Sequence, residues 1–311
     1  MVIPFFDYKR AYLDDKEEIL KTIDNVAGKG GFIMQTELRN FEMNLSNFVN
    51  SNFAIGVANA TDALELAWSN LNLKEGDEVI ISSHTMLATA SAIKLAGGTP
   101  IPVDILDDGL IDPSSIEKAI TSKTVGISPT HLNGRTCDME RIMNIAKENS
   151  LVVVEDAAQA LGSKFKGKNA GTFGYASCIS FYPAKVLGCL GDGGALLVQD
   201  KSLYDVFYQL HDHGRNDAGE AVLWGRNSRL DNIQAAILDF RLKEYTKVVN
   251  RRREIANIYQ SRLENIPQIT LPPKPEENSD NFDIFQNYEI QTERRDEFKE
   301  YLSNLKTGVA I

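Results

Sequence analysis

Two short segments of the chain hold residues whose types and spacing could do chemistry together. Lys185 ends the run Ser180-Phe-Tyr-Pro-Ala-Lys185, which precedes the glycine-rich Gly191-Asp-Gly-Gly194, and Asp156 comes one residue after the apolar run Leu151–Val154. A lysine among small and turn-forming residues can present its amine to an aldehyde and form a Schiff base, once desolvation or a nearby cation lowers its pKa. A carboxylate at the end of a strand can keep a pyridine nitrogen protonated through a charge-assisted hydrogen bond.

This combination indicates a site for pyridoxal phosphate, in which the lysine holds the aldehyde and the carboxylate makes the ring an electron sink. Gln159 could place an amide against the ring or its phenolic oxygen, and Ser180 offers a hydroxyl to a phosphate. Each signal alone is unspecific. A lysine after a strand is commonly a surface charge, and an aspartate that ends a strand is commonly a helix cap.

Further motifs stand in a fixed order along the chain. They are Val57-Ala-Asn-Ala-Thr61-Asp62-Ala-Leu, Gly76-Asp-Glu-Val-Ile, Glu155-Asp156-Ala-Ala-Gln159-Ala, Ser180-Phe-Tyr-Pro-Ala-Lys185, Gly191-Asp-Gly-Gly194, His213-Gly-Arg215 and Asn227-Ser-Arg229-Leu-Asp231. In order and spacing this set resembles the DegT/DnrJ family of sugar-nucleotide aminotransferases, from about Ile3 to the last residue.

The resemblance implies a pyridoxal-phosphate enzyme that moves an amino group from glutamate to a keto group of a nucleotide-linked sugar, for surface polysaccharide or glycosylated metabolite biosynthesis. Lys185 is then both the Schiff-base former and the general acid and base, while Asp156 keeps the ring electron-poor. A histidine at the lysine position would instead have indicated a dehydratase. Two alternatives stay open: a non-catalytic regulatory member of the family, and another pyridoxal-phosphate enzyme that acts on an amino acid.

The opening of a predicted helix forms the expected phosphate site. Thr61 and Asp62 follow a predicted strand, where backbone amides and the positive end of the helix dipole favour an anion. A plain N-cap is the alternative. We expect the amides of Ala60, Thr61 and Asp62, the Thr61 hydroxyl and Ser180 to bind the phosphate. The resemblance implies that Asn227 reaches it from the neighbouring subunit, and hence a homodimer with shared active sites.

Other positions are candidates for contacts with the ring or the substrate. Met86 stands where the family usually places an aromatic ring against the cofactor, and a core methionine is the alternative. His84, Tyr182 and Arg229 are the expected substrate-binding residues, although Tyr182 could simply pack. His131 has either a substrate or a structural role. The histidines and the three cysteines lack metal-ligand spacing, so we expect no metal site and reduced cysteines in or near the core.

Composition narrows the function classes. The net charge of −10, from 33 basic and 43 acidic side chains, disfavours nucleic acid and anionic membranes as partners. No apolar run approaches the roughly 20 residues of a membrane span, and the first residues lack the blocks of a signal peptide. We therefore expect a cytoplasmic protein.

Short runs rich in Val and Ile alternate with helical patterns over residues 53–199, which is typical of an α/β sheet covered by helices on both faces. The resemblance implies the aspartate-aminotransferase type, with three layers and a mostly parallel seven-stranded sheet. The expected strands are 54–58, 78–82, 100–105, 124–128, 151–155, 176–181 and 195–198, and the expected helices between them are 61–73, 85–96, 113–120 and 138–148.

The C-terminal part has a different pattern. A helix over 248–263 carries Arg251-Arg-Arg253, which we expect on a solvated face paired with Glu244 and Glu254. A strand over 282–292 and a helix over 294–305 follow. We therefore divide the chain into a large cofactor-binding domain with an N-terminal arm, 1–245, and a small α+β domain, 246–311, which we expect to be incomplete because family members usually continue further.

Overall fold

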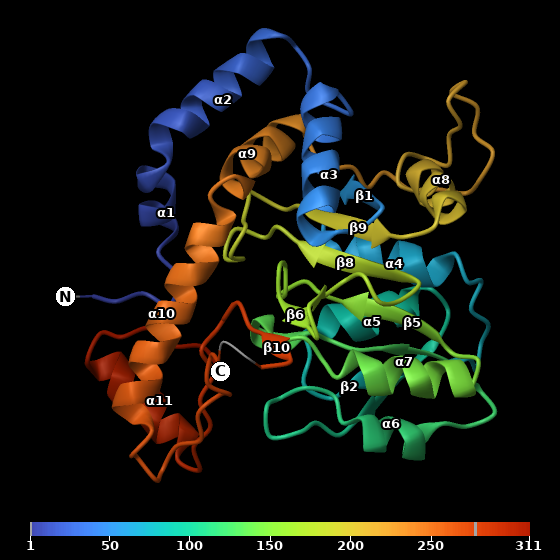
Figure 1. Ribbon diagram of the computed structural model, residues 1–311. Coiled ribbons are helices and arrows are strands. Elements are labelled where there is room, and N and C mark those ends of the chain that lie inside the picture. Colours follow the sequence, from blue (N-terminus) through green and yellow to red (C-terminus); the bar gives the residue numbers. More distant parts are fainter. Residues whose placement is uncertain (1, 277–278) are drawn as a thin grey trace.

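A seven-stranded sheet lies at the centre of the computed structural model, which describes residues 2–276 and 279–311 (Figure 1). The strands stand in the order β1-β9-β8-β5-β4-β2-β3, and all run in one direction except β9, which is antiparallel to both of its neighbours. They are β1 (Phe53–Val57), β2 (Glu78–Ser82), β3 (Thr99–Val103), β4 (Thr124–Ser128), β5 (Val152–Asp156), β8 (Ala176–Ser180) and β9 (Gly194–Val198). All the strands predicted from 53–199 are confirmed.

Helices cover both faces of this sheet, because successive strand residues point to opposite sides. In β9, Leu196 packs in a buried cluster with Trp68 and Phe207, whereas Leu197 belongs to another cluster with Leu45 and Leu238. The first face carries α4 (Ala60–Ser69), α5 (Leu87–Leu95) and α8 (Lys201–Leu210), and the second carries α3 (Thr36–Val49), α6 (Pro113–Ala119), α7 (Met139–Glu148) and α9 (Asn232–Leu242). The predicted three-layer α/β architecture is confirmed.

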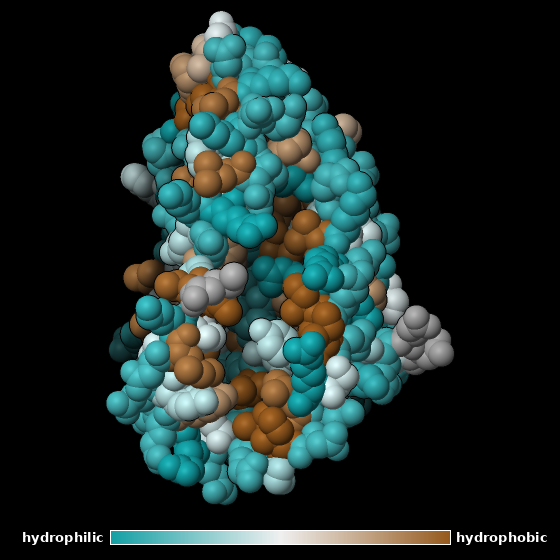
Figure 2. Space-filling model, turned by 90° about the vertical axis from the view of Figure 1, so that its left-hand side faces the viewer, coloured by the Kyte–Doolittle hydropathy of each residue, from teal (hydrophilic) through white to brown (hydrophobic). Residues whose placement is uncertain are grey.

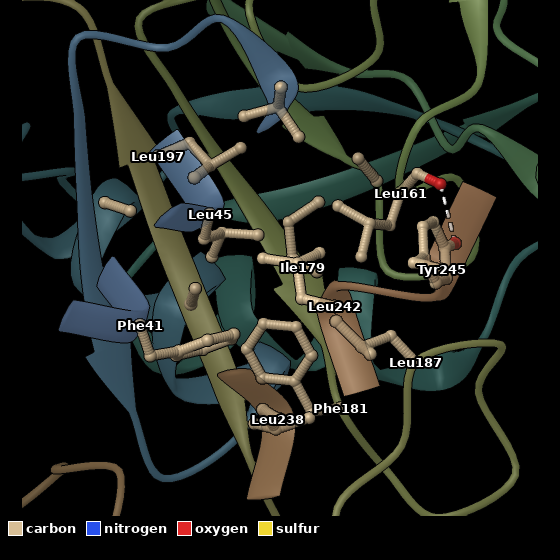
Figure 3. Close-up of a cluster of buried hydrophobic side chains, with 14 of the residues drawn as sticks. Phe41, Leu45, Leu161, Ile179, Phe181, Leu187, Leu197, Leu238, Leu242 and Tyr245 are labelled. Carbon is tan, nitrogen blue, oxygen red and sulfur yellow. Dashed lines mark hydrogen bonds between the residues drawn. The ribbon is translucent and has the colours of Figure 1, made fainter. Parts of the chain in front are cut away.

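The cluster between the sheet and α3 and α9 also anchors the loop that carries Lys185. Phe181 and Leu187 lie on either side of that lysine in the sequence, and both are buried in this cluster (Figure 3). At its edge the Tyr245 hydroxyl donates a 2.7 Å hydrogen bond to the Leu161 carbonyl. The loop is therefore fixed at both ends by apolar packing, which positions the lysine between them.

The remaining elements lie outside the central sheet. They are α1 (Tyr8–Asp14), α2 (Lys16–Gly28), the 3₁₀ turn η1 (Leu132–Gly134), β6 (Lys164–Phe165), β7 (Lys168–Asn169), α10 (Tyr245–Leu263), β10 (Asn281–Phe282) and α11 (Arg295–Asn304). The face that carries α1 and α10 is mostly hydrophilic with separate apolar patches around a hollow (Figure 2). Among the described residues, no helix is long and apolar enough to cross a membrane. The division of the chain at residue 245 stays a prediction.

The predicted strand over 282–292 is wrong beyond its first residue. Only Asn281–Phe282 form a strand, which pairs with β6. After it, Ile284 N donates to the Gly134 carbonyl and Gln286 N to the Asn133 carbonyl, both at 2.9 Å. The first part of this segment thus bonds to the η1 turn instead of a neighbouring strand, and at its end Gln291 forms only an isolated antiparallel bridge with Thr270, which the local sequence could not indicate. The helix predicted over 294–305 is confirmed as α11.

The arginine run of α10 also differs from expectation. Arg251 pairs with Glu254 at 2.8 Å, as predicted. Arg252 and Arg253 instead donate to backbone carbonyls of the C-terminal segment, Arg252 to Phe285 and Arg253 to Asp283. Two of the three cations are therefore partly buried and hold the chain that lies against this helix.

Candidate active site

The carboxyl edge of the sheet brings together residues from distant parts of the sequence. Asp156 ends β5 and pairs with Cys178 of the parallel strand β8. Two residues further along β8, Ser180 pairs with Gly194 of β9, and Gly194 in turn pairs with Val57, which ends β1 just before α4. Asp156, Ser180 and the beginning of α4 consequently meet at one edge.

Gly194 permits the close approach of these strands. A Cβ atom at this position would lie 2.5 Å from the Asn59 carbonyl carbon and 2.7 Å from the Ala60 nitrogen. Any other residue would push the beginning of α4 away from β8 and β9. This is the physical reason for a glycine at the end of the Gly191-Asp-Gly-Gly194 motif.

Asp156 is buried, with an exposed fraction of 4%, and its carboxylate is held from three sides. Oδ2 accepts a 2.6 Å hydrogen bond from Thr89 Oγ1, and Oδ1 accepts from Ala158 N at 3.1 Å and from Cys178 Sγ at 3.4 Å. Donors of this kind stabilise the ionised carboxylate in a buried place. Sequence reasoning missed Thr89, which lies in the first turn of α5, four residues after Thr85.

Lys185 lines a small cavity together with Ala158 and Gln159, which follow Asp156 in the chain. Burial lowers the pKa of its amine, whereas the Asp156 carboxylate acts in the opposite direction. The same cavity is lined by Gln159, Ser180 and Gln286. The structure therefore brings the predicted lysine, amide and hydroxyl to one cavity, where the Asp156 carboxylate is near enough to act on the lysine charge. The lowered pKa gives the lysine more of its neutral, nucleophilic form.

The beginning of α4 offers fewer amides than expected. Asn59 caps the helix and its Oδ1 accepts from Asp62 N at 2.9 Å, so this amide is already used. The Asp62 carboxylate accepts a 2.7 Å hydrogen bond from Ser228 Oγ. The amides of Ala60 and Thr61, with the Thr61 hydroxyl, are the donors of this first turn that can serve an anion.

The structure places the other predicted residues as follows. Gln159 Oε1 accepts from Asn133 N at 2.7 Å, which leaves the Gln159 amide nitrogen to donate into the cavity. Arg229 donates to Asp212 at 2.8 Å.

Four predicted positions are exposed: His84, Tyr182, Asn227 and Met86. Met86 stands at the N-cap of α5, and 69% of the residue is exposed, so the alternative of a core methionine is excluded.

His131 has a structural role. It is fully buried, and its Nε2 lies 2.9 Å from the Glu155 carboxylate, while its Nδ1 accepts from Cys137 N. Glu155 also accepts from the backbone amides of Gly171, Phe173 and Gly174. The pair thus fixes the chain next to Asp156. The three cysteines, Cys137, Cys178 and Cys189, are buried and unpaired, as predicted.

Comparisons with known proteins agree with this geometry. The family model of the DegT/DnrJ/EryC1/StrS aminotransferases matches residues 13–310. The chain is 37% identical to dTDP-3-amino-3,4,6-trideoxy-alpha-D-glucose transaminase of Streptomyces venezuelae, over 96% of this chain and 79% of the relative. Among solved structures it is similar to S. venezuelae DesV in complex with a ketimine intermediate, with a TM-score of 0.94, 37% identity and coverage of 98% and 82%. It is also similar to NtdA of Bacillus subtilis with bound cofactor PMP, with a TM-score of 0.88 and 33% identity over 97% of this chain and 70% of that one. The chain therefore belongs to the DegT/DnrJ/EryC1/StrS aminotransferase family.

Proposed function

We propose that the protein is a pyridoxal-phosphate-dependent aminotransferase that moves an amino group from glutamate to a keto group of a nucleotide-linked sugar. The observation that carries this proposal is the pair of Lys185, whose pKa is lowered by burial, and the buried carboxylate of Asp156. Family membership supports the reaction type, and the activity of the Streptomyces venezuelae relative supports the substrate class.

The donor set fits pyridoxal phosphate. A buried carboxylate suits a protonated pyridine nitrogen, a helix N-terminus with a neighbouring serine suits a phosphate, and a buried lysine suits an aldehyde. When bound, this cofactor supplies an aldehyde that condenses with amines and a ring that takes up electrons. We assign Ala60, Thr61 and Ser180 to its phosphate, and Asp156 to its ring nitrogen.

Each residue then has a definable task. Lys185 holds the cofactor at rest, and its Nζ takes the proton from the α-carbon of the amino donor once the amine is free and neutral. The Asp156 carboxylate is held toward the ring nitrogen by the hydrogen bonds that it accepts from Thr89 and Ala158. Gln159 orients the ring through its amide nitrogen.

The remaining candidates concern the substrate and the ring face. We assign the exposed His84 and Tyr182, together with Arg229, whose guanidinium is paired with Asp212, to the nucleotide-linked sugar. We assign the exposed Met86 to the face of the ring. The Asp62 carboxylate accepts from Ser228, and we assign it to holding the distant Asn227-Ser-Arg229 segment against α4 rather than to contact with the phosphate. The cytoplasmic location expected from composition stays a prediction.

We also assign the protein to a homodimer with shared sites. Asn227 is exposed, whereas the adjacent Ser228 is buried and bound to Asp62. The preceding segment carries the exposed apolar side chains of Val222, Leu223 and Trp224. An asparagine beside such an apolar segment suits a position that a second subunit covers, from which Asn227 reaches the partner's phosphate site.

The decisive experiment has two stages. Protein loaded with pyridoxal phosphate is reduced with borohydride and digested, and we expect the pyridoxyl label on Lys185 alone, with none at this position in Lys185→Ala. The pyridoxamine-phosphate form is then incubated with keto-sugars linked to dTDP, UDP or GDP, and the return of the pyridoxal absorbance identifies the acceptor. A label elsewhere would refute the lysine assignment. A labelled protein that responds only to small amino acids would favour elimination or sulfur transfer, and one that accepts no substrate would favour a regulatory role.

A further inference from the structure

Gln286 bonds to the main chain on both sides of Lys185. Its Oε1 accepts from Val186 N at 3.0 Å, and its Nε2 donates to the Ala184 carbonyl, also at 3.0 Å. The amide of Lys185 itself donates to the Tyr182 carbonyl at 2.8 Å. The peptide groups before and after the lysine are thus fixed by one side chain that lies about a hundred residues further along the chain.

Gln286 is itself held firmly in place. Its backbone amide donates to the Asn133 carbonyl, and Arg252 Nη1 donates to the carbonyls of Phe285 and Gln286 at 2.9 and 3.2 Å. Phe285 has a φ of 51°, which is unusual for a bulky residue and indicates that the surrounding contacts determine its conformation.

The turn that faces this segment, η1, requires a glycine at its end. Gly134 has a φ of 87°, and a Cβ there would lie 2.6 Å from Ile284 Cγ1 and 2.9 Å from Gln286 N. The preceding residue, Asn133, donates its own amide to Gln159 Oε1. One turn therefore positions both the amide expected against the ring and the glutamine that brackets the lysine.

We propose that Gln286 is a positioning residue for Lys185, through which the C-terminal segment sets the direction of the lysine side chain. This inference rests on the proposed function of Lys185. Fixing the two flanking peptide planes fixes the backbone dihedrals of the lysine and hence the direction of its Cα–Cβ bond. A small change in the direction of this bond is amplified along the side chain. It therefore moves the amine by a large part of the distance within which the amine must approach the group that it reacts with.

Two variants separate the two hydrogen bonds. Gln286→Met keeps the length of the side chain but makes neither bond, whereas Gln286→Glu keeps the acceptor for Val186 N and loses the donor to the Ala184 carbonyl. The matched control is Gln199→Met. Gln199 also makes two hydrogen bonds, accepting from Asn52 N and donating to Ser51 Oγ, but it lies beyond the opposite end of β9.

The first readout is hydrogen–deuterium exchange of the Val186 amide in the cofactor-free protein. We expect exchange about fivefold faster or more in Gln286→Met, little change in Gln286→Glu, and the wild-type rate in Gln199→Met. The second readout is the dissociation constant for pyridoxal phosphate together with the pH midpoint of its lysine-bound absorbance. We expect the constant to rise about five- to tenfold in Gln286→Met, with a shifted midpoint, and less in Gln286→Glu.

Unchanged Val186 exchange and unchanged cofactor affinity in folded Gln286→Met would overturn the proposal, as would an equal loss of affinity in Gln199→Met. If Gln286→Met does not fold, Gln286→Glu decides, because wild-type affinity and midpoint in that variant contradict a role for the donor. A failure of the proposed function looks different. In that case the wild-type protein takes no borohydride label at Lys185, while the exchange of Val186 still responds to Gln286.

Discussion

Thr89 Oγ1 donates a 2.6 Å hydrogen bond to Asp156 Oδ2, and the same hydroxyl lies 2.7 Å from Thr85 Oγ1. Because the Thr89 hydrogen points to the carboxylate, Thr89 must accept from Thr85, and Thr85 must accept from Thr130, 2.8 Å away. The three hydroxyls thus form a chain with one direction, in which each donor polarises the next. It ends on the carboxylate that we assign to the cofactor ring.

Removing the Thr89 hydroxyl, which is the last donor in this chain of hydroxyls, should weaken cofactor binding. Thr89→Val keeps the shape of the side chain but loses a hydrogen bond to a charged group, which contributes about 1.5–3 kcal/mol. We expect the affinity for pyridoxal phosphate to fall about tenfold or more, and Thr89→Ser to restore most of it. Thr136→Val is the control, since Thr136 makes a similar buried bond to Ser163 elsewhere. Equal affinities in Thr89→Val and Thr89→Ser would show that the hydroxyl does not act on the cofactor.

Changing the Asp156 charge should shift the titration of Lys185 in a defined direction. Burial lowers the pKa of Lys185, and the Asp156 carboxylate raises it. Only the neutral amine condenses with an aldehyde, so the rate of cofactor attachment to the apoprotein should increase with pH through this pKa. We expect a midpoint below the ordinary value of about 10.4 in the wild-type protein and a still lower one in Asp156→Asn. A midpoint that moves upward in the variant would show that the two charges are not neighbours.

Glu42 should make stability depend on pH. Burial raises the pKa of this carboxyl to about 7, and its Oε1 accepts from Gly56 N at 2.7 Å. The folded state then favours the protonated form, so its stabilisation is complete below the unfolded pKa of about 4.3 and is lost as pH rises through about 7. Between pH 4 and 8 the wild-type protein should lose on the order of 3 kcal/mol of its free energy of unfolding through this carboxyl. Glu42→Gln should abolish that loss.

Urea unfolding at several pH values measures this effect. The control is Glu117→Gln, because Glu117 is an exposed carboxylate on α6. If the difference in stability between wild type and Glu42→Gln is the same at pH 4 and pH 8, the buried carboxyl does not titrate as stated.

The sequence was sufficient to predict the central sheet because its strands are buried on both faces and read as short apolar runs separated by helices. The motif positions Lys185, Asp156 and Ser180 could be predicted for the same reason, since each lies at or just after the end of a predicted strand. Thr89 and Gln286 could not be predicted. Each acts through a contact between segments far apart in the chain, and no local pattern of residues signals such a contact.

The path of the C-terminal segment after β10 could not be predicted from its local sequence either. Its apolar residues predict a strand, but the contacts of Asn133, Gly134 and Arg252 impose an irregular path with a positive φ at Phe285. Tertiary contacts therefore override a local preference. Arg252 and Arg253 were misassigned for this reason too, because their charge indicates solvent while their partners are backbone carbonyls of the C-terminal segment.

Mixed dimers should test the shared site. We expect Lys185→Ala and Asn227→Ala chains each to be inactive alone and to regain activity when mixed and allowed to exchange, because one site of the hybrid receives both intact residues. A mixture of Lys185→Ala and Asp156→Asn should stay inactive, because these residues belong to the same chain and both sites remain defective. Recovery in both mixtures, or in neither once hybrids are verified, contradicts the assignment of Asn227 to the partner's site.

Met86 should affect the cofactor without affecting the fold. Its side chain is exposed at the N-cap of α5, so truncation creates no cavity and the melting temperature of the cofactor-free protein should not change. If its sulfur lies against the pyridine ring, the contact contributes about 0.3–1.5 kcal/mol, by analogy with other sulfur–aromatic pairs. Met86→Ala should then weaken the binding of pyridoxal phosphate by up to about tenfold, and Met86→Phe should hold or improve it. Leu87→Ala is the matched control, because Leu87 is the adjacent exposed apolar residue. Equal affinities in Met86→Ala, Met86→Phe and the wild-type protein would remove Met86 from the cofactor site.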